Sequence, residues 1–139
     1  MNYDDNHEFL NQARMKLGCR DLEETQRSLG RVLHTLRDQL TEEESEDLIQ
    51  KLPSDLVIIF LTAWKAKPKR VPALRLDHFV NRVIAYDKQK PKPVFSTEID
   101  ALRATLIVLH DLEKRFDVLH LLPYSLKNDL ESAWHIEAA

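Results

Sequence analysis

One motif is written twice in this chain, and it limits the fold more than any other feature. The first copy, LPSDLVIIFLTAW, spans residues 52–64, and the second, LPYSLKNDLESAW, spans residues 122–134. The first copy alone could be a buried strand or a buried helix, but the second places its apolar residues at i, i+4, i+7 and i+8, as only a helix requires. Proline also suits the first turn of a helix, so two helices are predicted. The shared apolar residues are Leu56, Phe60, Ala63 and Trp64 in the first copy and Leu126, Leu130, Ala133 and Trp134 in the second.

Further matches extend the motif into an internal repeat. Their order is the same in both halves, and an offset that drifts from 70 to 73 residues returns to 70 at the Leu-Pro motifs. We therefore expect a real repeat, with copy 1 at about residues 5–64, a basic connector at 65–75 and copy 2 at about 76–134. The alternative is coincidence between leucine-rich helices. The matched pairs are Phe9/Phe79 and Asn11/Asn81 at 70, and Leu29/Leu102, Leu33/Leu106, Leu36/Leu109 and Asp38/Asp111 at 73.

Apolar spacing and capping residues predict an all-α fold of about eight helices, in two similar four-helix halves packed as one domain. The fourth helix is apolar on all sides, and the sixth should be deeply buried. The expected helices cover about residues 6–17, 21–40, 41–52, 52–64, 76–87, 97–112, 114–121 and 123–134. The capping residues are Gly18 at a C-terminus, and Asp21 with Glu24, Thr41 with Glu44, and Ser96 or Thr97 at N-termini.

Length and composition fit one cytoplasmic domain. A chain of 139 residues buries roughly two-thirds of its unfolded surface, and 43% hydrophobic with 31% charged residues is ordinary for a soluble protein. The net charge of −3 argues against a dedicated nucleic-acid binder. A single cysteine, Cys19, excludes an internal disulfide. We expect neither a signal peptide nor a transmembrane segment, because the longest apolar run is far shorter than the ~20 residues needed to span a bilayer.

Several segments together resemble a known bacterial family, the domain of unknown function 2267. They are SLGRVLHTLRDQLTEEESEDLIQKLP (28–53), Trp64, FVNRV (79–83) and the second LPYSL (122–126). The resemblance covers nearly the whole chain and is weaker in the second half, which lacks the acidic capped turn of the family pattern. It implies a small all-helical bacterial protein with no established activity and no catalytic residues to carry over.

The sequence predicts neither a metal site nor a catalytic site. His34 and Asp38 are four residues apart, but no ligand pair such as HExxH occurs, and a metal needs three or four converging ligands. The histidines are therefore expected on solvated or half-buried helix faces. The acidic run from Thr41 to Asp47 is explained by a capping turn. We expect no catalytic residue, no metal and no cofactor; an enzyme with an unrecognised site is the alternative.

Two basic loops bracket the fifth predicted helix and could contact a polyanion. A helix about 18 Å long would hold the loops at opposite ends, on separate patches. No aromatic residues lie among the cations, so a base-stacking platform is not indicated. The other interpretation is that these are solubilising residues in exposed connectors. The candidates are Lys65, Lys67, Lys69, Arg70, Arg75, Lys88, Lys90 and Lys92.

The two Leu-Pro helices differ on the face opposite the shared one. Val57, Ile58 and Leu61 in the first copy stand where the second copy has polar residues. One half's core cannot bury both faces of a helix, so this face is predicted to pack against the other half or against a partner chain.

These patterns predict a function class without naming a process. The leading hypothesis is a non-enzymatic interaction or scaffold module of a bacterial cytoplasm, acting through a protein partner or self-association. The alternative is a regulatory module that binds nucleic acid or another polyanion through the lysine-rich loops.

Overall fold

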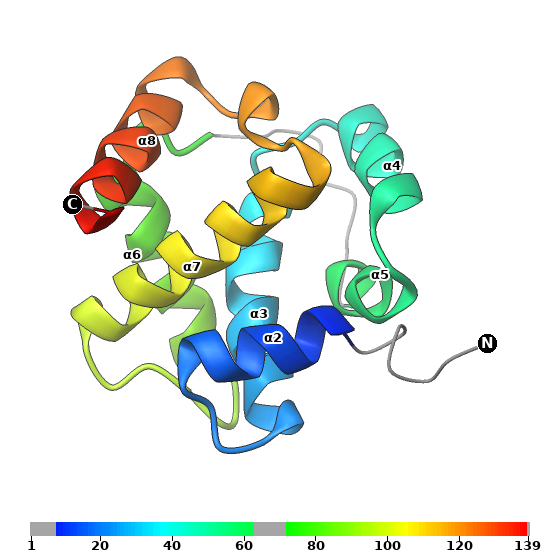
Figure 1. Ribbon diagram of the computed structural model, residues 1–139, viewed down its shortest axis with the longest axis vertical. Helices are drawn as coiled ribbons and strands as arrows, with labels where there is room; N and C mark the ends of the chain where they lie inside the picture. The colour runs from blue at the N-terminus through cyan, green and yellow to red at the C-terminus, as the bar shows by residue number, and fades with distance from the viewer. Residues whose placement is uncertain (1–7, 63–71, 139) are drawn as a thin grey trace.

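The computed structural model describes residues 8–62 and 72–138, and all regular structure in these residues is helical (Figure 1). Over these residues the chain forms seven α-helices, one 3-10 turn and no strands. The predicted all-α fold class is confirmed. The helices are α2 (Glu8–Leu17), α3 (Leu22–Arg37), α4 (Glu42–Lys51), α5 (Ser54–Leu61), α6 (Leu76–Lys88), α7 (Glu98–Phe116) and α8 (Tyr124–Ala138), and the 3-10 turn is η1 (Leu119–Leu121).

The capping residues predicted from the sequence begin and end the helices as expected. The Asp21 carboxylate accepts a hydrogen bond from the Glu24 amide at 2.8 Å, at the start of α3. Thr41 and Glu44 form the reciprocal capping box of α4, with bonds of 3.0 and 2.8 Å. Gly18 follows α2 with φ 72°, a left-handed conformation that glycine adopts without strain. Of the two residues proposed to begin α7, Thr97 is the cap.

The predicted helix at residues 114–121 is wrong. Helix α7 continues through Phe116, since Glu113 and Lys114 are good helix formers and nothing interrupts them. It ends at Asp117, whose φ of 55° is left-handed. The Glu113 carboxylate then accepts the amides of Val118 and Leu119, both at 2.8 Å, and the chain makes only the turn η1 before α8.

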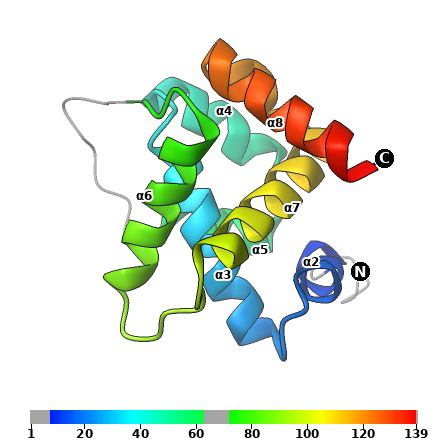
Figure 2. The same cartoon turned by 90° about the vertical axis from the view of Figure 1, so that its left-hand side faces the viewer.

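Helix α3 is the centre of the molecule. It contacts α2, α5, α6 and α7, which surround it in both views (Figures 1 and 2). Its apolar stripe is fully buried, and the long helix α7 adds a second buried stripe that packs against it. The buried residues form one continuous core from both ends of the chain, so the fold is one domain. The fully buried leucines of the two helices are Leu29, Leu33 and Leu36 in α3 and Leu109 and Leu112 in α7.

The first Leu-Pro helix, α5, is held at its C-terminus by polar side chains of α3. The Nε2 of His34 donates to the Ile59 carbonyl at 2.8 Å. The Nη1 of Arg37 donates to the carbonyls of Phe60 at 2.5 Å and Thr62 at 3.0 Å. These carbonyls belong to the last turn of α5, where helical partners run out, so α3 supplies the missing donors.

Two hydrogen bonds cross between the halves in a reciprocal way. Lys16 of α2 donates to Asp111 of α7 at 2.7 Å, and the hydroxyl of Tyr86 in α6 donates to Asp38, which follows α3. Lys16 and Tyr86 are 70 residues apart, and Asp38 and Asp111 are 73 apart. The same offsets relate the matched sequence positions. The helix contacts are reciprocal too, with α2 on α7 and α6 on α3.

Candidate functional site

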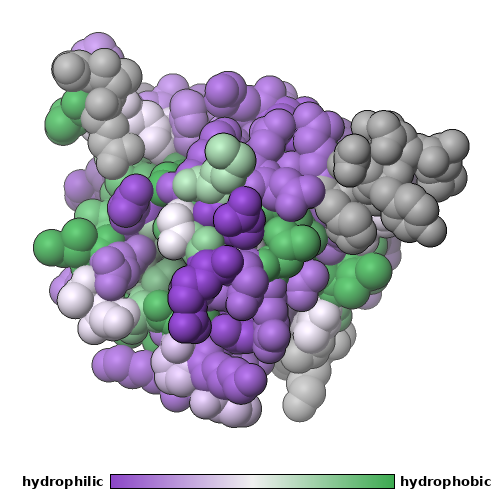
Figure 3. All heavy atoms as spheres, turned by 60° about the horizontal axis from the view of Figure 1, so that its bottom comes forward, coloured by the Kyte–Doolittle hydropathy of each residue, from purple (hydrophilic) through white to green (hydrophobic). Residues whose placement is uncertain are grey.

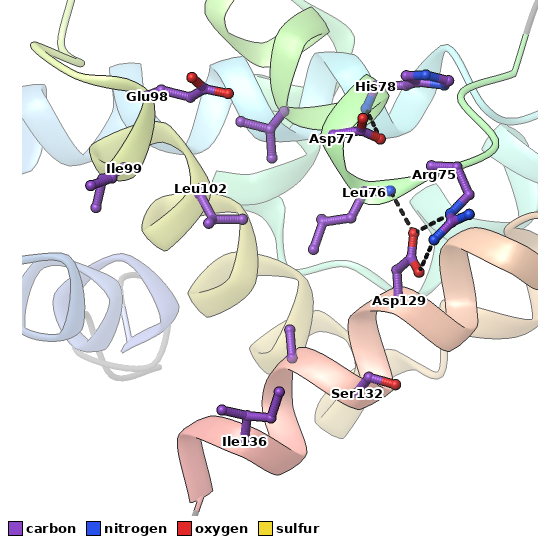
Figure 4. A pocket seen from close by; sticks show the side chains of 12 residues that line it. Arg75, Leu76, Asp77, His78, Glu98, Ile99, Leu102, Asp129, Ser132 and Ile136 are labelled. Atoms are coloured by element: carbon purple, nitrogen blue, oxygen red, sulfur yellow. Dashed lines mark hydrogen bonds and ion pairs between the residues drawn. The ribbon is translucent and has the colours of Figure 1, made fainter.

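A hollow with a volume of about 830 Å3 lies between α6, α7 and α8 (Figure 4). The first turns of α6 and α7 form two of its sides, and the second half of α8 forms the third. Its lining is mostly apolar, with charged side chains around it. The apolar lining residues are Leu76, Val80, Ile99, Leu102, Ala133 and Ile136.

Two isoleucines on this hollow are almost fully exposed. Ile99 of α7 and Ile136 of α8 are 74% and 73% exposed. Sequence reasoning missed both. Ile99 lies three residues before Leu102, so its spacing does not distinguish it from the buried leucine stripe of α7. It is exposed because it stands in the first turn, beyond the point where α7 is covered by its neighbours.

A two-pronged ion pair fixes the position of α8 against the start of α6. The Nε and Nη2 of Arg75 donate to the two carboxylate oxygens of Asp129 at 2.8 and 3.1 Å, and the Leu76 amide donates to the same carboxylate at 3.0 Å (Figure 4). These bonds lower the pKa of Asp129, with the Arg75 bond as the largest cause, and raise the pKa of Arg75. Arg75, one of the predicted polyanion contacts, is therefore occupied within the chain.

The charged side chains around the hollow have a net negative charge. Asp77 and Glu98 lie in the first turns of α6 and α7, and both are exposed. Asp129 is balanced by Arg75. The lining thus holds three carboxylates and one cation, with His78 beside them.

A second hollow, of about 650 Å3, lies between α3, α5 and the loop from α6 to α7. We call it the α3–α5 cleft. The predicted contacts Lys90 and Lys92 line it, together with basic residues of α3 that sequence reasoning missed. A signal was present, because these α3 residues follow i, i+4, i+7 spacing on one helix face. They are Arg27, Arg31 and His34.

A buried ion pair fixes the loop that carries Lys90 and Lys92. Arg31 and Asp87 are 6% and 2% exposed, and the Arg31 Nε donates to Asp87 at 3.0 Å. Asp87 also accepts the amides of Val94 and Phe95, and Arg31 donates to the Lys92 carbonyl at 3.2 Å. The loop is therefore tied to α3 at both ends of its basic stretch.

His34 corrects the expectation that the histidines lie on solvated or half-buried faces. It is 5% exposed. Burial is the largest cause that lowers its pKa, to about 4, and the nearby charges of Arg37, Lys90 and Arg31 lower it further. The imidazole is therefore neutral at pH 7, where its Nε2 proton bonds Ile59.

The other residues predicted to contact a polyanion do not gather at one place among the described residues. Lys88 is exposed at the C-terminal end of α6, opposite the end that carries Arg75, as the sequence predicted for the two loops. The Nζ of Lys92 lies 3.9 Å from the Oε1 of Glu23. Lys65, Lys67, Lys69 and Arg70 lie outside the described residues.

The predicted interface residues on α5 differ in their exposure. Ile58 is 69% exposed and Leu61 is 41% exposed, while Val57 packs partly buried against the core. The main contacts with the other half are made by α3 and α2 instead of α5. Packing of this face against the other half or against a partner chain therefore stays a prediction.

Figure 3 shows a face on which hydrophilic side chains predominate and hydrophobic ones form separate patches. Among the described residues, no three His, Cys, Asp or Glu side chains are placed to hold a metal ion. Within the same residues, no helix combines the length and apolar character needed to cross a bilayer.

The fold and the hollows define a class: a single-domain, all-helical protein with an apolar groove and a basic cleft. The chain belongs to the family described as uncharacterized conserved protein (DUF2267), whose family model matches residues 6–128. The resemblance read from the sequence is confirmed. A search of curated proteins found no match.

Proposed function

We propose that this protein is a non-enzymatic interaction module that binds an amphipathic helix of a partner protein in the hollow between α6, α7 and α8. The observation that supports this most is the pair Ile99 and Ile136, each more than 70% exposed beside an apolar hollow of about 830 Å3. Isolated exposed apolar residues are ordinary, but apolar residues gathered on a hollow are typical of binding sites. A groove between helices suits a helix, which presents its apolar side chains at i, i+3, i+4 and i+7.

The charge on the rim narrows the class of partner. Asp77 and Glu98 are exposed carboxylates without a cation on the same rim, because Arg75 is engaged by Asp129. A partner helix with lysine or arginine residues beside its apolar stripe would complement them. Such rim charges mainly steer association and set specificity.

Site-specific crosslinking tests this proposal. A photo-crosslinking amino acid at Ile99 is expected to capture, in the native host, a peptide with a helical apolar stripe and flanking basic residues. Ile136→Glu should abolish that product, because a carboxylate in the groove would lose its water without gaining a partner. The matched control is a crosslinker at Met15 of α2, which is equally exposed at 73% and does not line the hollow.

Three outcomes would contradict the proposal. The first is an Ile99 product that also forms from Met15, and the second is one that survives Ile136→Glu. The third is a product made of two copies of this chain, which would mean that the groove serves self-association.

We also infer that the two halves are copies of one unit. Reciprocal bonds support this, since Lys16 with Asp111 and Tyr86 with Asp38 occupy matched positions. The two hollows support it as well, because several residues that line one hollow are matched, at the same sequence offsets, by residues that line the other. The matched lining pairs are Leu10/Val80, Ile59/Asp129 and Thr62/Ser132 at 70, and Gln26/Ile99 at 73.

A bacterial cytoplasm fits the single cysteine and the family resemblance. Nucleic-acid binding is less favoured, because Arg75 is occupied and Lys88 lies at the far end of α6. Only Lys90 and Lys92 of the described candidates share one hollow.

A further inference from the structure

We propose that the α3–α5 cleft binds a small organic anion, a phosphate or carboxylate group joined to a short apolar body. The cleft is separate from the α6–α7–α8 groove and shares no residue with it. It is lined by four cations, Arg27, Arg31, Lys90 and Lys92, and by two carboxylates, Glu23 and Asp55.

Within the described residues, some of these cationic groups lack an ion-pair partner or a hydrogen-bond acceptor. Arg31 is balanced by the buried Asp87. Lys90 has no ion-pair partner within the described part of the chain. The buried Nε of Arg27 has no hydrogen-bond acceptor there. A buried N–H without an acceptor is uncommon in folded proteins, and a bound anion is one of its ordinary explanations. Lys90 is thus a cation of the cleft without an ion-pair partner in the described residues, and Arg27 beside the cleft has a buried donor without an acceptor.

The cationic side of the cleft is built before any ligand arrives. Arg31 and Asp87 fix the loop through the Lys92 carbonyl and the amides of Val94 and Phe95. A loop held in place loses less conformational freedom when it binds, so its charges contribute more to affinity. Burial is the main cause of the lowered pKa of His34, and Arg37, Lys90 and Arg31 lower it as well because they bring positive charge near the imidazole.

Apolar residues make up much of the remaining lining of the cleft, and this decides the class of ligand. Leu10, Ile58, Ile59 and Pro91 line it, and Gly30 adds no side chain. Ile58 is 69% exposed beside them, so an apolar ligand body seated here would remove part of its surface from water. Inorganic phosphate would leave this surface bare, whereas an anion with an apolar body would cover it.

Glu23 acts as an internal competitor. Its Oε1 lies 3.0 Å from the Arg27 Nη1 and 3.9 Å from the Lys92 Nζ, so one carboxylate bridges the two cations. The Glu23 side chain is 70% exposed, and such a pair is weak enough for a ligand to replace. Removing this carboxylate should therefore strengthen binding, a gain that damage to the fold cannot produce.

Amide NMR titration with three probes tests the proposal: monomeric octyl phosphate, inorganic phosphate and octanol. Octyl phosphate is expected to bind most tightly and to shift the amides of Gly30, Ile59 and Lys90. Arg27→Met and Lys90→Gln should each weaken it roughly five- to tenfold, and Glu23→Gln should strengthen it several-fold. Lys88→Gln is the control, since Lys88 is exposed near the same loop but does not line the cleft, and it should change nothing.

Each outcome decides the question. Competition by vesicles containing phosphatidic acid would identify a lipid headgroup as the source of the anion, and no competition would identify a soluble phosphomonoester; both support the site. Absence of octyl phosphate binding at about 1 mM, in low salt where charge contacts are strongest, overturns it. So do shifts confined to the α6–α7–α8 groove, equal losses in Lys88→Gln, or weaker binding in Glu23→Gln. Binding to DNA without any response to octyl phosphate overturns it too.

Discussion

Helix α3 carries an unusual number of buried polar side chains, and almost all of them are bonded. The hydroxyls of Thr25 and Thr35 donate to carbonyls one turn earlier, at 2.8 and 2.9 Å. His34 and Arg37 reach the end of α5, and Arg31 reaches the loop after α6. Burial of a polar group is tolerated when its hydrogen bonds are made, so these side chains join α3 to its neighbours without breaking the core.

His34 makes stability depend on pH in the mildly acidic range. Its pKa in the folded chain is about 4, below the ordinary value of 6.5. As the pH falls from 6.5 to 4, the unfolded chain takes up a proton at His34 and the folded chain does not. The free energy of unfolding should therefore fall through this window, by up to about 3 kcal/mol, and level off below it.

The variant His34→Gln tests this dependence. Glutamine keeps a side-chain N–H for the Ile59 carbonyl but does not titrate. The free energy of unfolding is measured in urea at about pH 7 and about pH 4.5. Between these two values it should fall by up to about 3 kcal/mol more in the wild type than in the variant. Equal losses in the two proteins would show that His34 is not the group responsible.

At the scale of helices, the two glycines of the chain differ in backbone conformation, since one lies inside a helix and the other follows the end of one. Gly30 is in the middle of α3, and a Cβ there would meet only the Ile59 Cγ2 at 3.6 Å, an ordinary contact. Gly18 has room around it but stands at φ +72°. Glycine inside a helix costs stability, whereas glycine at a left-handed position relieves strain.

Alanine at these two positions should change stability in opposite directions. Gly30→Ala should raise the free energy of unfolding by about 0.5 to 1 kcal/mol, and Gly18→Ala should lower it by about 1 kcal/mol. Thermal unfolding followed by circular dichroism measures both, with each variant serving as the control for the other. A Gly30→Ala protein that melts below the wild type would mean that α5 packs on α3 too tightly for a methyl group.

Sequence reasoning found the helix starts because capping is local. Asp21, Thr41 and Thr97 each bond an amide three residues ahead, so the signal and its partner lie together in the chain. It failed at residues 114–121, where the end of α7 depends on the conformation of Asp117 rather than on a glycine or proline.

Neither hollow could be predicted, because each depends on contacts between distant parts of the chain. Arg31 meets Asp87 across 56 residues, and Arg75 meets Asp129 across 54. No spacing rule links residues so far apart. The exposure of Ile99 has the same origin, since it depends on where neighbouring helices end.

At the scale of the whole molecule, α3 packs on helices from both halves of the chain and so joins them. Helix α3 packs on α6 and α7, and α2 packs on α7. The bonds of Lys16 and Tyr86 cross the same boundary. One continuous core takes residues from both halves, so the chain should unfold as one cooperative unit.

Trp134 of α8 allows a direct test, because its indole N–H donates to the Leu106 carbonyl at 3.0 Å. In Trp64→Phe, Trp134 is the single tryptophan and its fluorescence reports on the second half, while circular dichroism reports on all helices. The two signals should give the same denaturant midpoint. A tryptophan midpoint that departs from the helical one would show that the halves unfold separately.

The reciprocal bonds between the halves have the form of an isologous interface. In a symmetric dimer, residue i of one subunit contacts j of the other, and j contacts i; Lys16 with Asp111 and Tyr86 with Asp38 repeat that relation inside one chain. On the proposed repeat, an ancestral homodimer would have carried two identical hollows, because any substitution appears in both subunits at once. Joining the subunits in one chain removes that restriction. One hollow can then gain carboxylates on its rim while its counterpart gains Arg27, Lys90 and Lys92, so that a single small protein carries two hollows of opposite charge balance.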